Sequence, residues 1–234
     1  MSERAGRGVH DPTITQRGVA ALLPAAGLAA ELALLARIAR GDAPWGILTW
    51  RPTARALVVP RSLARRASFT GAAAASMLRG WPVLVRESGG GIVPLTAGVL
   101  VVALAYASSE VKIEEAYRRL CEPLAAAIGE HGVAVTLGAV PGAFCDGAYN
   151  LVAAGRKLAG TAQRWRAGAV LAHAVILVDP ELPAAIGAVD AFAGEVGVEA
   201  AALDRHVALA ELVPGVALDD LARRCAARFA AAFG

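Results

Sequence analysis

The chain has 234 residues, 56% of them hydrophobic, and a formal net charge of +3. Charged residues still make up 18% and are spread along the whole length, which argues against an intrinsically disordered protein. The best apolar run, 91–107, is shorter than the about 20 residues of a membrane span and contains Pro94 and Thr96, so we expect a pair of buried strands there.

The first 40 residues place basic residues before an apolar patch, an order that secretory signal peptides share. Pro24 and Glu31 interrupt this patch, and a helical pattern runs past any plausible cleavage point. We therefore expect a loose N-terminal leader at 1–17 and a helix at Leu28–Arg40. The length is compatible with a single domain, which we place at 18–234.

Short apolar runs separated by turn residues predict strands in the next part of the chain. The runs Ile47–Trp50 and Ala56–Val59 come first, and the alanine-rich segment 70–80 predicts a short helix. Residues 82–106 then read as strand, glycine loop, strand, turn and strand.

The second half begins with helical periodicity over 108–132, for which we expect a serine cap. The apolar positions that define this helix are Val111, Ala116, Leu120, Leu124 and Ile128. Segments 133–138 and 148–179 alternate short β runs with glycine turns, and from 180 onward we expect surface loops and two or three helices. Helices segregated from turn-linked strands predict an α+β fold, with a mixed, mostly antiparallel β-sheet packed against helices.

The three cysteines show no metal-type spacing, and the four histidines are scattered, so we expect reduced thiols, no metal site and a cytoplasmic protein. Cys121 and Cys225 lie within helical patterns, where free cysteines behave as small core residues. Cys145 instead stands in a turn-rich segment, where its thiol can be accessible to solvent.

Arginine supplies almost all the positive charge, with 21 arginines against two lysines, Lys112 and Lys157. A lysine in such a background suggests a compact ammonium directed at one oxygen or sulfur. Lys112 reads as a surface residue, whereas Lys157 could favour the thiolate of Cys145 if the two segments are neighbours. The alternative is that the cysteine is inert, as most free cysteines are.

The segment RESGGGIV, residues 86–93, places three glycines between two apolar runs. It is either a loop whose bare amides receive an acyl chain or a phosphate, or a plain hairpin turn. Its spacing fits neither the Rossmann fingerprint nor the P-loop. Polar residues elsewhere could line a site or face water: Asp146, Arg156, Gln163 and Arg164. Arg61, Arg65 and Arg66 lack the aromatic neighbours of a nucleic-acid interface, so no nucleic-acid partner is expected.

From about Leu34 to Asp179 the sequence resembles the lipoate-protein ligase A and octanoyltransferase group, which shares its catalytic fold with biotin-protein ligases. The motifs that carry the resemblance are RESGGGIV, IEEAYRRL and CDGAYNLVAAGRKLAGTAQRWR. The last is similar to the pattern of the cysteine-dependent octanoyl amidotransferase branch. The matching residues are Cys145, Gly147, Tyr149, Asn150, Leu151, Gly155, Lys157, Ala159, Gly160, Gln163 and Arg164.

The resemblance implies a biotin/lipoate protein ligase-like catalytic domain that acts as an acyltransferase. An octanoyl or lipoyl group would pass through a cysteine thioester to the lysine of a lipoyl domain or a glycine-cleavage H-like carrier, without a cofactor or a membrane. The implied catalytic residues are Cys145 and Lys157. The implied substrate-binding residues are Arg86, Ser88, Gly89, Gly90, Gly91, Tyr149, Gly160, Gln163 and His173.

Further details of the site follow from the same resemblance. Backbone amides near Gly160 and in the glycine loop would stabilise the oxyanion. Apolar strand residues such as Val93 and Leu100 would line the acyl slot. His173 lies in an apolar strand run, where a buried histidine with a local hydrogen bond is the commoner case.

The sequence also departs from both branches of the group. Thr96, Val101 and Ala103 stand where amidotransferases carry Asp, Asn and Ser, and Pro94, Leu95 and Thr96 occupy the acidic and histidine positions of the ligases. Two alternatives therefore stay open. One is a lipoate-protein ligase that uses ATP and Mg; the other, which the lost polar groups favour, is a non-catalytic acyl-protein binding module.

Overall fold

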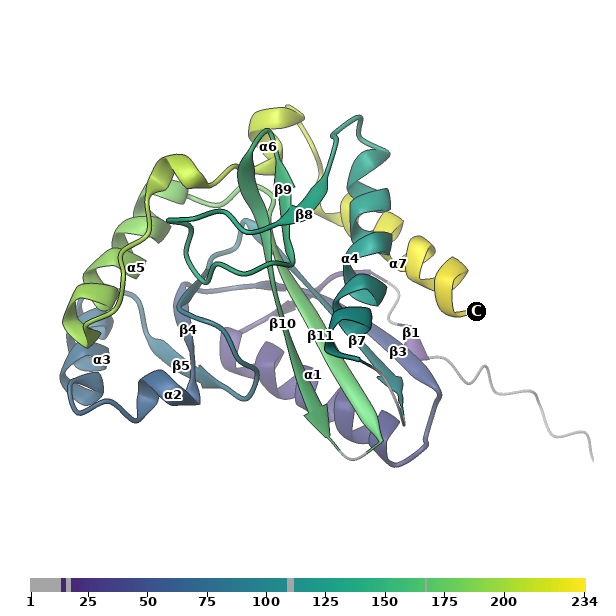
Figure 1. Cartoon of the computed structure of the whole chain (residues 1–234), viewed down its shortest axis with the longest axis horizontal. Coiled ribbons are helices and arrows are strands. Elements are labelled where there is room, and N and C mark those ends of the chain that lie inside the picture. The colour runs from purple at the N-terminus through teal and green to yellow at the C-terminus, as the bar shows by residue number, and fades with distance from the viewer. Residues whose placement is uncertain (1–13, 16–17, 109–111, 167) are drawn as a thin grey trace, which may run out of the picture.

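The computed structural model describes residues 14–15, 18–108, 112–166 and 168–234. Within these residues, a long twisted sheet carries helices on both faces, and a smaller sheet lies beside it (Figure 1). The expected α+β architecture with a mixed, mostly antiparallel sheet is therefore confirmed.

The large sheet has the strand order β1-β3-β7-β11-β10-β9-β8, and β2 also pairs with β3. Its pairs are antiparallel except for β1 and β2, which run parallel to β3. The strands are β1 (Ile14–Thr15), β2 (Ala20–Leu22), β3 (Trp45–Pro52), β7 (Val99–Ala107), β8 (Thr136–Gly138), β9 (Asn150–Ala153), β10 (Arg156–Arg166) and β11 (Ala169–Leu177).

The small sheet consists of β4 (Ala56–Pro60), β5 (Val83–Arg86) and β6 (Val93–Leu95), with β4 in the middle. Strand β5 pairs with β4 in parallel and β6 pairs with it antiparallel. The glycine loop therefore crosses from one edge strand to the other, and the hairpin alternative is wrong. Strands β6 and β7, both buried, belong to different sheets.

Figure 1 shows α4 and α7 on one face of the large sheet, α1 on the opposite face, and α2, α3 and α5 gathered around the small sheet. The helices are α1 (Pro24–Ala39), α2 (Arg61–Ala64), α3 (Phe69–Leu78), α4 (Ile113–Gly129), α5 (Leu182–Val196), α6 (Leu209–Leu212) and α7 (Leu218–Phe233), with one 3-10 turn at Leu203–Arg205. The three predicted helices in the first two thirds of the chain are present, and the short α2 was not predicted.

Successive side chains along the central strands point to opposite faces of the sheet, so the core is divided between the two faces. On β7, Leu100 and Val102 pack in the cluster beneath α4 and α7, whereas Val99 and Val101 pack against the small sheet and α5. The prediction that Leu100 lines the acyl slot is therefore wrong, because this side chain points to the other face. Val93 does line the cavity described below.

Two helix starts differ from the predictions. Helix α1 begins at Pro24 rather than Leu28, because proline is well accommodated in the first turn, where no backbone N–H bond is lost. Helix α4 begins at Ile113 with Lys112 at its cap position and no capping side chain, so the expected serine cap is wrong. Val111, one of the predicted apolar positions, lies outside the described residues.

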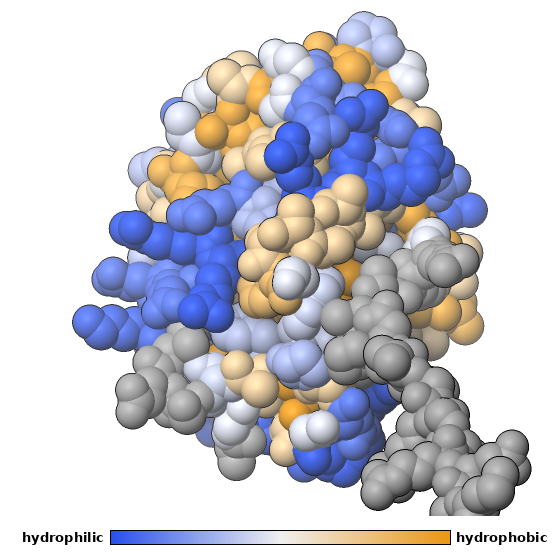
Figure 2. Space-filling view, turned by 90° about the vertical axis from the view of Figure 1, so that its right-hand side faces the viewer, coloured by the Kyte–Doolittle hydropathy of each residue, from blue (hydrophilic) through white to orange (hydrophobic). Residues whose placement is uncertain are grey.

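Most of the predicted leader, 1–13 and 16–17, also lies outside the described residues, and Ile14–Thr15 pairs with β3. In the part of the chain that the structure describes, no helix is long and apolar enough to cross a membrane. Figure 2 shows the side of the molecule on which α7 ends, where broad hydrophilic areas lie above and to the left of an apolar patch.

Candidate active site

Cys145 lies in the loop between β8 and β9, with a backbone φ of 46° that residues other than glycine rarely adopt. Its sulfur accepts a hydrogen bond from the Gly91 N–H at 2.9 Å and lies 3.8 Å from Nη2 of Arg86. The side chain is partly exposed. Because such backbone strain persists only where the surroundings impose it, this loop is a strong candidate for a functional element.

Arg86 ends β5, is 5% exposed and organises the glycine loop around the sulfur. Its Nε and Nη2 donate to the Gly89 carbonyl, Nη2 also donates to the Gly91 carbonyl at 2.8 Å, and Nη1 donates to the Val58 carbonyl at 2.9 Å. Burial lowers the pKa of the guanidinium, and the proximity of Cys145 opposes that shift. The Arg86 guanidinium therefore presents a buried positive charge to the Cys145 sulfur.

Gly90 must be a glycine in this arrangement. Its φ is +102°, and a Cβ at this position would lie 2.7 Å from the Cys145 sulfur and 2.8 Å from Nη2 of Arg86. The glycine run thus permits a close approach between one loop and the thiol of another.

Lys157, on β10, is fully buried beneath the cysteine loop. Its Nζ donates to the carbonyl oxygens of Phe144 and Cys145 at 2.6 and 2.8 Å and lies 4.7 Å from the centre of the Phe144 ring. Burial lowers the pKa of the Lys157 ammonium to about 8, although the Cys145 and Asp146 charges oppose the shift. The two predicted catalytic residues are thus brought together, with the ammonium on the backbone of the cysteine rather than on its sulfur.

His206 supports the same loop from the C-terminal segment and was not predicted. Its Nε2 accepts the Phe144 N–H at 3.1 Å, its Nδ1 donates to the Ala202 carbonyl at 2.9 Å, and its ring stacks on Phe144 at 4.7 Å. Burial, helped by the Lys157 charge, lowers the pKa of His206 to about 4. The histidine is therefore neutral, with its proton on Nδ1.

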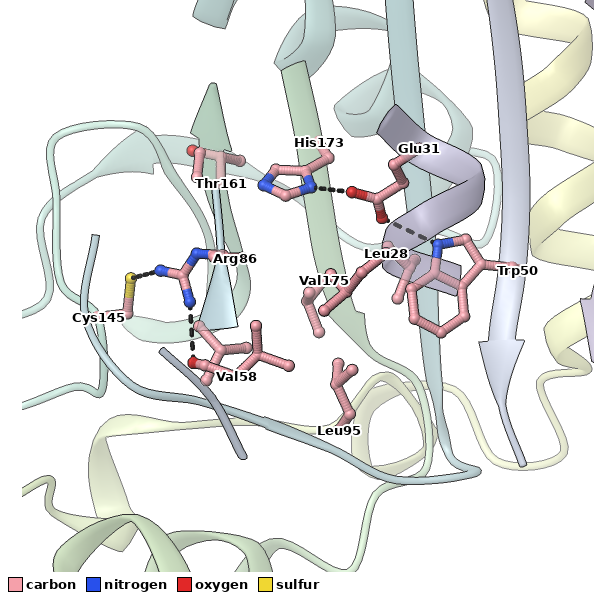
Figure 3. Close-up of a pocket in the computed structure, with 14 residues that line it drawn as sticks. Leu28, Glu31, Trp50, Val58, Arg86, Leu95, Cys145, Thr161, His173 and Val175 are labelled. Atoms are coloured by element: carbon pink, nitrogen blue, oxygen red, sulfur yellow. Dashed lines mark hydrogen bonds and ion pairs between the residues drawn. The ribbon is translucent and has the colours of Figure 1, made fainter. Parts of the chain in front are cut away.

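An apolar cavity extends from Cys145 between the two sheets. Figure 3 shows Cys145 and Arg86 at one end, Glu31 and Trp50 at the other, and aliphatic side chains between them. It is lined by Leu28, Glu31, Trp50, Val58, Arg86, Val93, Leu95, Val101, Cys145, Gly160, Thr161, Ala162, His173 and Val175. Its shape and polarity suit a hydrocarbon chain attached at the sulfur.

A chain of buried polar groups forms one wall of this cavity. The Nδ1 of His173 lies 2.6 Å from Oε2 of Glu31, whose Oε1 accepts the Trp50 indole N–H at 2.9 Å. Ser88 lies 2.9 Å from Nε2 of the same histidine. Every one of these polar groups has a partner, which limits the cost of placing them beside an apolar cavity.

A groove also reaches Cys145, from the side of α4. It shares Cys145, Thr161 and Ala162 with the apolar cavity. Its walls include the parallel rings of Tyr117 and Tyr149, whose centroids are 4.4 Å apart. A larger, open groove lined by 141–146 and 198–201 shares only the cysteine with the apolar cavity.

The structure brings all the predicted site residues to these cavities or to the loops that form them. The glycine loop and Arg86 contact the sulfur, Gly160 lies against Lys157, Tyr149 and Gln163 line the groove, and His173 and Ser88 stand beside the apolar cavity. The other polar candidates hold loops in place: Asp146 accepts three bonds from its own loop, Arg156 binds the His206 carbonyl and Glu211, and Arg164 binds Glu87.

Several functional candidates were missed in the sequence: Glu31, Trp50, Tyr117, Phe144 and His206. Only Glu31 carried a usable signal, because it stands on the buried stripe of α1 with Gly27, Leu34 and Ile38. An acidic residue on an apolar helix face demands a buried partner. The partners of the others come from distant segments.

The three departures from the amidotransferase pattern have different surroundings. Val101 lines the apolar cavity, where asparagine would be polar. Thr96 is buried and its hydroxyl accepts the Gly98 N–H at 3.3 Å. Ala103 packs under α1 and does not line the cavity. One of the three substitutions thus makes the cavity itself more apolar.

Residues 24–230 match the family model described as the lipoyl protein ligase A/B catalytic domain. The chain is 44% identical over 115 residues to an octanoyl-GcvH:protein N-octanoyltransferase of Kyrpidia tusciae, a match that covers 44% of this chain and 40% of that relative. The matched part therefore spans less than half of that relative's length.

Solved structures share the fold at low sequence identity. Lipoate-protein ligase A bound with ATP superposes with a TM-score of 0.73 at 19% identity, covering 92% of this chain and 85% of the other. The bi-partite lipoate protein ligase of Thermoplasma acidophilum, solved in work on it and its E2 lipoyl domain, gives 0.64 at 19% identity, covering 94% and 81%.

Proposed function

The chain belongs to the lipoyl protein ligase A/B catalytic domain family, and on that premise we propose that it is an acyltransferase of protein lipoylation. It moves an octanoyl or lipoyl group through a thioester on Cys145 to the lysine of a lipoyl domain or a glycine-cleavage H-like carrier. The observation that carries the proposal is the Cys145 sulfur at the mouth of an apolar cavity, with an N–H and a guanidinium directed at it.

The first half-reaction loads the enzyme. The thiolate of Cys145 attacks the acyl carbonyl of the donor and the C–S bond forms. The bond between the acyl carbon and the donor's heteroatom breaks, and the donor leaves with the proton that the thiol gave up. The Gly91 N–H and Arg86 favour the thiolate, because both donate toward the sulfur. Lys157 keeps the strained loop in place through the Cys145 carbonyl and adds a positive charge.

The second half-reaction releases the acyl group. The neutral amine of the acceptor lysine attacks the thioester, the C–N bond forms, the C–S bond breaks, and the amine loses a proton. Donors in the glycine loop are available to the oxyanion once the sulfur is acylated, and one such donor is typically worth about 100-fold or more in rate. Each methylene buried in the apolar cavity adds about 0.8 kcal/mol to the binding of the chain.

The lipoate-protein ligase alternative has weaker support in this chain. Leu95 and Thr96 stand at positions where lipoate-protein ligases carry acidic and histidine side chains. In this chain Leu95 lines the apolar cavity, and the Thr96 hydroxyl accepts a backbone N–H. Neither supplies a carboxylate for a magnesium ion that accompanies ATP. The proposed route forms and breaks a thioester and requires no nucleotide.

The test incubates purified protein with octanoylated and lipoylated carrier domains, with and without ATP, and follows intact mass. We expect an acyl adduct without ATP, its absence in Cys145→Ser, and its transfer to an unmodified carrier. Full transfer by Cys145→Ser would remove the cysteine from the reaction. Acyl transfer from free lipoate that requires ATP would favour the ligase, and carrier binding with no adduct from any donor would favour the binding module.

A further inference from the structure

We propose that the carrier protein docks on the edge formed by Ile113 and Trp165, and that its lysine arm reaches Cys145 along the groove beside Tyr117 and Tyr149. This inference rests on the proposed acyl transfer and adds to it the surface and the path that the carrier uses. The occupant is a folded carrier domain with an extended lysine side chain, which carries the acyl group as donor or receives it as acceptor.

Continuity between the cavities selects this groove. An acylated lysine is a linear object, with the acyl chain on one side of the carbonyl and four methylenes on the other. The groove beside the tyrosines shares Cys145, Thr161 and Ala162 with the apolar cavity. An acyl chain in the cavity, a carbonyl at the sulfur and an arm in the groove therefore form one path. The open groove at 198–201 meets the cavity only at the cysteine.

The groove lining suits a lysine arm. The stacked rings of Tyr117 and Tyr149 supply an apolar wall for the methylenes, as aromatic faces do for long amphipathic side chains. Gln163, Asn150 and Asp146 also line the groove, with Asp146 next to Cys145 and Gln163 bonded to Ile113 and Trp165. Asp146 is exposed and adds a negative charge next to Cys145, which favours approach of an ammonium.

The outer edge of the groove carries two exposed apolar side chains from different elements. Ile113 at the start of α4 is 62% exposed, and Trp165 near the end of β10 is 39% exposed. Gln163 links them, because its amide donates to the Ile113 carbonyl at 3.1 Å and accepts the Trp165 indole N–H at 2.9 Å. A fixed, exposed tryptophan beside a reactive groove is the kind of residue that dominates binding at protein interfaces.

The first experiment compares Trp165→Ala and Ile113→Ala with Met77→Ala/Leu78→Ala, which removes exposed apolar side chains at the distant end of α3. Steady-state transfer is measured against the concentration of carrier domain. We expect KM for the carrier to rise about tenfold or more in each edge variant, with kcat changed far less, and no change in the α3 variant. An unchanged KM in both edge variants would overturn the docking surface.

The second experiment tests the path of the arm. Tyr117→Phe keeps the stacked ring and should retain far more transfer to the carrier than Tyr117→Ala, which removes the apolar wall of the groove. Ala200→Trp fills the open groove on the other side and should have no effect on transfer. Normal transfer in Tyr117→Ala, or a strong loss in Ala200→Trp, would overturn the path.

Loading of Cys145 from an octanoyl thioester of a small thiol requires no carrier protein. This measurement therefore distinguishes failure of the proposed acyl transfer from failure of the docking inference. Failure of the unmodified protein to form this adduct, or to pass it to a carrier, would count against the proposed function. Normal loading and transfer, together with insensitivity to all changes at Ile113, Trp165 and Tyr117, would count against the docking inference alone.

Discussion

Cys145 is held by two different kinds of contact, one to its sulfur and one to its backbone. The sulfur receives the Gly91 N–H from the loop that joins the edge strands of the small sheet, and it faces Arg86 at the end of β5. The backbone carbonyl receives the Lys157 ammonium from the large sheet. The strained φ of this residue is therefore maintained by groups from both sheets.

Replacement of Lys157 by arginine should strongly reduce acyl transfer although the charge is retained. The ammonium fits between two carbonyl oxygens and against Gly160, where a Cβ would already lie 3.0 Å from Nζ. A planar guanidinium is too wide for this buried slot. Rates of acyl-enzyme formation by intact mass measure the effect, and the exposed Lys112→Arg is the matched control. Near-normal turnover in Lys157→Arg would contradict this role.

Gly90→Ala should slow the formation of the acyl-enzyme by about 100-fold, because a small displacement of reacting groups costs that much. The new methyl group would meet both the Cys145 sulfur and Arg86, at a φ that favours glycine. Gly71→Ala, on α3 with no atom within 4 Å of the added carbon, is the control. A Gly90→Ala protein that loads octanoyl at the normal rate would show that this close approach is not required.

At the scale of elements, the C-terminal segment stabilises the loop that carries the cysteine. The Ala202 N–H donates to the Gly142 carbonyl, the Val207 N–H donates to the Lys157 carbonyl, and His206 accepts the Phe144 N–H. One short segment is thus attached to both the cysteine loop and β10. Its position keeps Phe144 packed between the Lys157 ammonium and the imidazole.

We expect His206→Leu to lose acyl-enzyme formation and His206→Gln to retain much of it, because the glutamine carbonyl can still accept the Phe144 N–H. The control on folding is the far-UV spectrum and the unfolding transition of each variant. Rescue by glutamine distinguishes the loss of this acceptor from a general loss of packing. If leucine and glutamine behave alike, the hydrogen bond does not position the loop.

His206 also makes the stability depend on pH. Its pKa falls from 6.5 to about 4 on folding, because burial and Lys157 disfavour the charged ring, while the backbone of Ala202 and Leu203 and the Asp190 charge oppose the shift. The unfolded chain therefore binds a proton more readily between these values, and stability is lost as pH falls from 6.5 toward 4. Urea unfolding of the wild type and His206→Gln should show a smaller decrease in the variant. Identical decreases would remove His206 as the cause.

At the scale of the whole molecule, the two faces of the large sheet differ in what they contact. The face under α4 and α7 is filled by a continuous apolar cluster, and the other face bears the cavity, with the small sheet opposite. Arg224 and Arg228 of α7 both bind Glu130, which connects α7 to the end of α4. Packing on one face thus supports a site on the other.

Phe229→Ala should lower the free energy of unfolding by about 3–5 kcal/mol, because it empties a fully buried ring position beneath α7. Octanoyl loading of Cys145 below the unfolding transition should stay close to normal, because this ring lies on the face away from the cavity. Chemical denaturation and intact mass measure the two quantities. A large loss of loading in protein that is still folded would contradict the separation of the two faces.

Part of the candidate site could be predicted from the sequence alone. Cys145, Lys157 and the glycine loop were recognisable from residue types and spacing, and the order of strands and helices followed from local periodicity. These features are local: a helical stripe such as that of α4, or an apolar run such as Val99–Ala107, requires no knowledge of its neighbours.

Only the tertiary structure decided how the parts meet. Lys157 contacts Cys145 through the backbone carbonyl of the cysteine rather than through its sulfur. The sulfur instead faces Arg86, which is distant from Cys145 in the sequence. Leu100 and Val101 differ by one place and lie on opposite faces of the sheet, and His206 acts on a loop some 60 residues earlier. Such contacts depend on register and on the packing of two sheets, which are set by the folded chain as a whole rather than by any short stretch of it.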